Sequence, residues 1–149
     1  MEIYVESKQK RIEIDPEELQ KKTVKILGDL GCEPDSIISI TLVDSIQMAE
    51  LNLKYRGKEG PTNVLSFSQL EGESPPRKNL LGDVVICADR AADDAAELGY
   101  TEDQMVLYLL IHGILHLLGH THDVSEDARD MSARVEEIFR GFYPEHEIA

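Results

Sequence analysis

The chain has 149 residues, of which 42% are hydrophobic and 30% charged, and this composition fits one globular domain with a buried core. Its net charge of −14 argues against a general nucleic-acid-coating protein, and no apolar run approaches the roughly 20 residues needed to cross a bilayer. The first ten residues lack the pattern of a secretory signal, and Cys32 and Cys87 share no metal-ligand spacing, so the cytoplasm is the expected compartment.

The charges are unevenly distributed along the chain. Residues 1–78 hold 11 Lys and Arg against 14 Asp and Glu, whereas residues 79–149 hold 4 against 15. A surface that binds anions must therefore take its cations mainly from the first half. Three basic groups occur there, each of which could equally be solvated surface: Lys8, Lys10 and Arg11; Lys21 and Lys22; and Lys54, Arg56 and Lys58.

Hydrophobic periodicity, turn residues and caps divide the chain into strands and helices. In chain order we expect strands over 2–6 and 10–14, a helix over 15–31, a strand over 36–43, a helix from Asp44 to about Tyr55, a strand over 61–67, a loop over 71–79, a strand over 80–88, and helices over 89–99, 101–119 and 125–142. The strands come early and the helices late, so the sequence predicts an α+β fold in a single domain, residues 1–149.

Several predicted helix ends carry recognisable signals. Asp15 and Asp44 are expected N-caps, Thr101 and Gln104 form a capping box, and Gly119 can end the helix that begins at Thr101. These signals place the histidine-rich stretch "HGILHLLGHTH" (112–122) at the C-terminal end of an apolar helix.

Three histidines in this stretch have the spacing of a metal site. His112 and His116 are four residues apart, so they face the same way on a helix and can hold one ion. His120 continues the spacing, but in an unbroken helix it would lie about 12 Å along the axis from His112. If the chain instead turns back at Gly119, His122 can approach the same ion.

Three imidazoles and an open position are the arrangement of catalytic zinc, whereas a structural site is usually closed by a fourth residue. His112 and His116 alone could be buried core histidines, and the third histidine favours metal. Asp123 could be a replacement ligand, an acceptor for an imidazole N–H, or a simple surface acid.

The spacing matches zinc peptidases of the metzincin type, but the glutamate that follows their first histidine is replaced by Gly113. Loss of a general base typically costs a factor of about 10²–10⁴, so protease activity is not expected. A substrate that carries its own negative charge fits better, because zinc generates hydroxide at neutral pH and a nearby cation can neutralise a phosphoryl group. Arg56 offers the planar donor fork suited to phosphate, and Lys58 adds a point charge.

Three segments together, "LNLKYRGKEGPTNVLSF" (51–67), "LLGDVVI" (80–86) and "HGILHLLGHTH" (112–122), resemble the YbeY family of bacterial metal-dependent endoribonucleases. The resemblance implies a zincin-like α+β domain, with about five helices packed on a small mixed sheet. It implies one zinc ion per chain on His112, His116 and His122, and a functional role for Arg56.

The resemblance also implies an activity and partners: cleavage of single-stranded RNA in ribosomal RNA maturation and ribosome quality control, with the small ribosomal subunit, a ribosomal protein and a ribosome-assembly GTPase as partners. The sequence departs from the family pattern at His120-Thr121, where Tyr-Asp is usual, and at Asn63, where Asp is common. Asp83 could fix a metal histidine or play a structural role at a strand start, and Thr62 and Ser66 could contact phosphate or simply line a strand face.

Two other functions stay open at this stage. A non-catalytic ribosome-assembly factor could use zinc mainly to stabilise the helix and turn. A small metalloprotease with an unusual base is the third hypothesis, ranked last because of Gly113. The identity of the metal is not fixed, since three imidazoles also suit nickel, copper or iron.

Overall fold

The structure, a computed structural model, describes residues 1–68, 79–119 and 125–145. Its elements in chain order are β1 (Glu2–Ser7), α1 (Pro16–Asp29), β2 (Ile37–Val43), α2 (Ser45–Arg56), β3 (Val64–Ser68), β4 (Leu80–Cys87), α3 (Ala88–Leu98), α4 (Glu102–Leu117) and α5 (Ser125–Phe142). The expected α+β class is confirmed, and α1 and α2 lie between strands as the predicted order of elements indicates.

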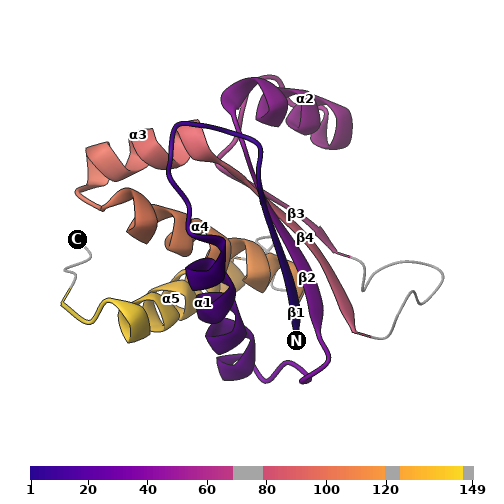
Figure 1. The fold of residues 1–149 in the computed structure, drawn as a ribbon, viewed down its shortest axis with the longest axis vertical. Coiled ribbons are helices and arrows are strands. Elements are labelled where there is room, and N and C mark those ends of the chain that lie inside the picture. Colours follow the sequence, from indigo (N-terminus) through magenta and orange to yellow (C-terminus); the bar gives the residue numbers. More distant parts are fainter. Residues whose placement is uncertain (69–78, 120–124, 146–149) are drawn as a thin grey trace.

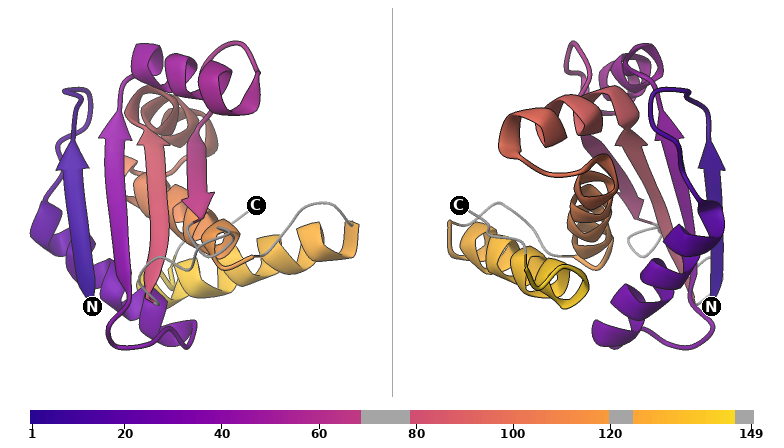
Figure 2. Two further views of the ribbon diagram at one scale, coloured as in Figure 1. Left: turned by 90° about the vertical axis from the view of Figure 1, so that its right-hand side faces the viewer. Right: turned by 60° about the vertical axis from the view of Figure 1, so that its left-hand side comes forward.

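The four strands form one mixed sheet in the order β1-β2-β4-β3 (Figure 2). β1, β2 and β4 run parallel, and β3 is antiparallel to β4. β4, which is apolar except for Gly82 and Asp83, is an inner strand between β2 and β3, as its sequence predicts. β3 is left at one edge of the sheet.

The helices are divided unequally between the two faces of the sheet (Figure 1). The main core packs α1, α3 and α4 against one face, and α5 packs against the outer side of α4. A smaller cluster, centred on Met48 of α2 and Val85 of β4, covers the end of the opposite face.

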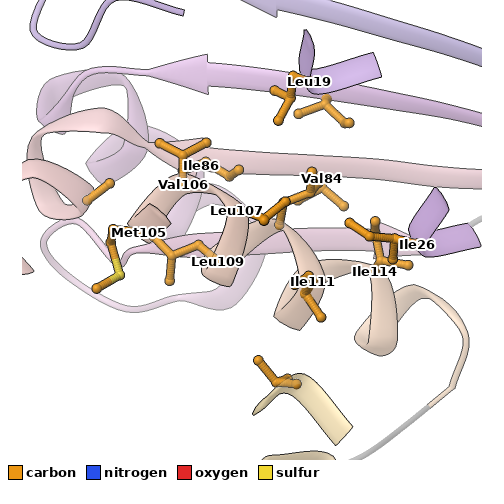
Figure 3. Close-up of a cluster of buried hydrophobic side chains, with 14 of the residues drawn as sticks. Leu19, Ile26, Val84, Ile86, Met105, Val106, Leu107, Leu109, Ile111 and Ile114 are labelled. Carbon is orange, nitrogen blue, oxygen red and sulfur yellow. The ribbon is translucent and has the colours of Figure 1, made fainter. Parts of the chain in front are cut away.

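The helix α4 lies inside the main core (Figure 3). Its side chains Leu107, Ile111 and Ile114 are at most 1% exposed, because the sheet, α3 and α5 surround most of its circumference. A stripe at four-residue intervals is left half-buried: Gln104, Tyr108, His112 and His116. Both predicted metal-binding histidines of α4 therefore lie on its one accessible side.

The predicted caps are confirmed. Asp15 accepts from the backbone N–H groups of Glu17 and Glu18, and Asp44 and Thr101 each form a capping box. α4 ends at Leu117, and Gly119 follows with φ of 90°. The path of the chain from His120 to Val124 lies outside the described residues.

The predicted strand over residues 10–14 is wrong. The side-chain amide of Gln9 donates to the carbonyl of Ile12 and accepts from its N–H, both within 2.9 Å. These bonds replace those of a strand partner, and the segment serves as the connection that leads from β1 to α1. The alternation in the sequence instead reflects the burial of Ile12, which is 4% exposed.

No helix in the described ranges is both long enough and apolar enough to span a membrane.

Candidate active site

His112 and His116 point their rings toward one common position beside α4. Their Nε2 atoms are 3.2 Å apart, and their ring planes meet at 61°. Two nitrogens bound at about 2.0–2.1 Å to one tetrahedral zinc lie roughly 3.3 Å apart. The pair therefore already has the spacing that two ligands of one ion require.

Hydroxyl groups of the edge strand hold this end of α4 in place. Ser66 donates from Oγ to the carbonyl of Gly113 at 2.8 Å, and Ser68 donates to the carbonyl of Leu117 at 3.3 Å. The Ser66 hydroxyl thus donates its hydrogen bond to a backbone carbonyl of α4, which favours a structural role for Ser66 over contact with phosphate.

Gly113 lets α4 approach the sheet closely. A Cβ built at this position would lie 2.7 Å from Val84 Cγ1 and 3.2 Å from both Val64 Cγ2 and Ser66 Oγ. The residue after the first histidine thus faces the sheet, and a glutamate there has no space in this packing. The glycine at this position accounts both for the missing general base and for the close contact of α4 with β3 and β4.

An open groove of about 470 Å³ contains the two histidines. Its lining residues come from the end of α2, from β3 with the residues before it, and from α4: Arg56, Thr62, Asn63, Val64, Leu65, Ser66, Ser68, His112 and His116. Within the described part of the chain, none of these residues is acidic, although the chain holds 29 Asp and Glu. The groove is therefore suited to an anion despite the net charge of the molecule.

Arg56 reaches this groove because α2 ends with it. Gly57 follows in the left-handed conformation with φ of 66°, and the loop then leads into β3. Asn52, 4% exposed, donates from Nδ2 to the carbonyl of Gly60 at 2.8 Å and so ties the loop back to α2. This positioning role of Asn52 was not predicted from the sequence, although a polar residue between the two leucines of "LNL" in a short helix is a signal for it.

The remaining predicted residues are not all brought to the groove. Lys58 is exposed and is not among the lining residues, whereas Asn63 and Thr62 line the groove. Asp83 alternates with Val84, which faces α4, so its side chain projects from the opposite face of the sheet. Its side chain therefore lies on the face of the sheet away from His112 and His116.

His120, His122 and Asp123 lie outside the described residues. Among the residues that are described, no group of three or more His, Cys, Asp or Glu side chains forms a metal site. The described part of the site consists of two convergent imidazoles, one guanidinium and an open side. Such a set can serve a metal-assisted hydrolase that acts on an anionic substrate.

Comparisons with known proteins agree with this class. The family model described as endoribonuclease YbeY matches residues 4–143. The chain is similar to the endoribonuclease YbeY of Syntrophotalea carbinolica, with 44% identity covering 92% of this chain and 93% of that protein. It is also similar to that of Geobacter sulfurreducens, with 39% identity covering 93% and 94%.

A solved structure has a similar fold. The solution structure of TM1509 from Thermotoga maritima has a TM-score of 0.60 and 26% identity, and the match covers 95% of this chain and 92% of that one. The chain belongs to the endoribonuclease YbeY family. The resemblance seen in the motifs is thus confirmed, and with it the class of enzyme, a nuclease family.

Proposed function

We propose that this chain is a zinc-dependent endoribonuclease that cleaves single-stranded RNA in the cytoplasm and acts in ribosomal RNA maturation and ribosome quality control. The observation that supports this most directly is the groove that Arg56 shares with His112 and His116. Membership of the family supports the activity on RNA.

His112 and His116 would hold the ion, with His122 as the proposed third ligand. The distance of 3.2 Å between the two Nε2 atoms and the half-buried rings fit this role. When bound, zinc supplies a Lewis acid that polarises a phosphoryl oxygen.

Arg56 would bind the non-bridging oxygens of the scissile phosphate through its planar fork and stabilise the charge that develops there. Lys58, exposed two residues further on, would extend this cationic edge toward the next phosphate. The absence of acidic side chains from the described lining keeps repulsion of the RNA backbone low at this point.

The proposed partners are ribosomal RNA within the small subunit, a ribosomal protein and a ribosome-assembly GTPase. They come from the resemblance in the motifs alone. A groove that binds an RNA backbone is consistent with the first of them.

The test is cleavage of a single-stranded RNA by the metal-loaded protein and by Arg56→Gln. We expect Arg56→Gln to lower the maximal cleavage rate by about 10²–10³-fold with unchanged metal content, because a preorganised donor to the phosphoryl group is lost. Lys54→Gln is the matched control, since it removes a neighbouring cation that does not line the groove. Equal rates for Arg56→Gln and wild type would overturn the proposal.

A further inference from the structure

The outer edge of β3 runs along the groove that contains the histidines. β3 is the terminal strand of the sheet, and within the described ranges no strand pairs with its outer edge (Figure 2). The groove is lined by Val64, Leu65, Ser66 and Ser68 of this strand.

The ladder to β4 fixes which backbone groups point outward. The N–H of Cys87 donates to the carbonyl of Asn63 at 2.9 Å, and the register continues with Val64 opposite Ile86. In an antiparallel pair, hydrogen-bonded positions alternate with non-bonded ones. Leu65 therefore bonds to β4, whereas Val64 and Ser66 direct both N–H and C=O away from it.

Within the described residues, this edge lacks two of the usual protections against pairing, charged side chains and proline. Exposed edge strands are normally guarded by charged residues, by proline or by a covering element. The segment from Thr62 to Ser68 contains no charged residue and no proline. Within the described part of the chain, its outward backbone groups are thus open to a ligand in the groove.

We infer that the outer edge of β3 binds the sugar–phosphate backbone of the RNA and makes the groove selective for RNA over DNA. This inference rests on the proposed function. The charge of the groove supports an RNA strand as the occupant, because Arg56 supplies a cation and the described lining contributes no acidic side chain.

The chemistry of the two backbones is complementary. The N–H groups of Val64 and Ser66 can donate to phosphate oxygens, which are acceptors only. The carbonyl groups of the same residues need donors, and RNA provides one at each ribose 2′-hydroxyl. DNA has no such donor, so the carbonyls would face a backbone that cannot satisfy them.

The N–H contacts are tested by single-turnover cleavage of RNA. The concentration of metal-loaded protein is varied, and the protein concentration that gives half of the maximal rate is measured. Val64→Pro removes one outward N–H at a position outside the ladder to β4, and Val64→Ala trims the side chain but keeps the N–H. Ser66→Pro and Ser66→Ala form a second matched pair. We expect each proline variant to raise half-saturation about tenfold above its alanine partner, as loss of a hydrogen bond to a charged group predicts.

The carbonyl contacts are tested on the RNA, which needs no protein variant. Unlabelled strands of roughly ten nucleotides compete with the labelled RNA substrate for the protein. They are an all-RNA strand, the same sequence with single 2′-deoxy substitutions, and DNA. We expect DNA to compete at least tenfold more weakly, and single 2′-deoxy strands to lose roughly two- to tenfold at the one or two nucleotides against β3.

The two proposals fail in different ways. If the wild-type protein does not cleave RNA, the proposed function fails. If it cleaves RNA while proline and alanine variants saturate alike, or RNA and DNA compete equally, the inference on β3 alone is overturned. Equal half-saturating concentrations for the proline and alanine variants would instead favour an extended peptide as the partner of this edge.

Discussion

Gly113 occupies the position at which zinc peptidases of the metzincin type carry a general-base glutamate. A Cβ there would lie 2.7 Å from Val84 Cγ1, so the residue must lack a side chain for α4 to rest on β3 and β4. The glycine therefore leaves the general-base position without a carboxylate and allows the close approach of α4 to the edge strand.

We predict that Gly113→Ala destabilises the protein by about 1–3 kcal/mol, because overpacking outweighs the better helix propensity of alanine. Urea unfolding measures this change. Gly28→Ala in α1 is the matched control, because its Cβ would meet nothing within 4 Å, and we expect it to be neutral or slightly stabilising. Equal stability changes for the two variants would contradict the packing argument.

At the scale of elements, Asp89 joins the beginnings of two helices. It lies in the first turn of α3 and accepts from both the N–H and the hydroxyl of Ser45, the first residue of α2, each at 2.8 Å. Arg11, in the connection after β1, approaches the same carboxylate at 3.5 Å. These bonds orient α2, whose last residue is Arg56.

The hydrogen bonds from Ser45, with a further contribution from Arg11, hold the pKa of the Asp89 carboxyl below its ordinary value of 3.8. A carboxyl whose pKa is lower when folded stabilises the protein at pH values above its unfolded pKa, and this contribution is lost as the pH falls through the folded pKa. The effect of Asp89 on stability should therefore be complete at neutral pH and disappear in acid.

We predict that Asp89→Asn lowers the free energy of unfolding by about 1–2 kcal/mol at pH 7 and by progressively less below pH of about 4. Urea unfolding across this pH range provides the measurement. Asp93→Asn serves as control, since Asp93 is largely exposed and pairs with Arg11. A difference from wild type that stays constant down to acidic pH would show that the charge of Asp89 is not responsible.

At the scale of the whole molecule, the net charge is strongly negative, whereas the described lining of the groove is not. The net charge is −14, yet the described lining of the groove combines Arg56 and two histidines with no acidic side chain. Among the described residues, this lining offsets the repulsion of RNA by the molecule as a whole, which favours the groove as the place where the proposed RNA substrate binds.

We predict that metal removal destabilises the entire fold, because the proposed ion would connect α4 to the segment that follows it. Chelation should lower the midpoint of thermal unfolding by about 5–10 °C, as expected for an ion present at roughly 100 times its dissociation constant. Differential scanning calorimetry with and without chelator measures this shift. His112→Ala should unfold at the same temperature in both conditions, and a wild-type midpoint that ignores the chelator would refute the metal site.

The sequence by itself determined the local features of this protein. The caps at Asp15, Asp44 and Thr101 and the shared face of His112 and His116 depend on interactions between residues only a few positions apart, so their spacing was enough. The expected strand at 10–14 failed because alternation records burial, and Gln9 replaced the strand partner that the pattern assumes.

The tertiary structure alone decided what meets in the groove. Arg56 and the histidines come together because β3 turns back beside β4 and α4 packs beneath both, and these contacts join residues far apart in the chain. The packing of α4 on the face of Val84 likewise placed Asp83 on the opposite face, and the strand order left the backbone of Val64 and Ser66 without a partner strand among the described residues. Side-chain pattern does not encode which edge of a strand stays open, because that depends on the packing of the whole sheet.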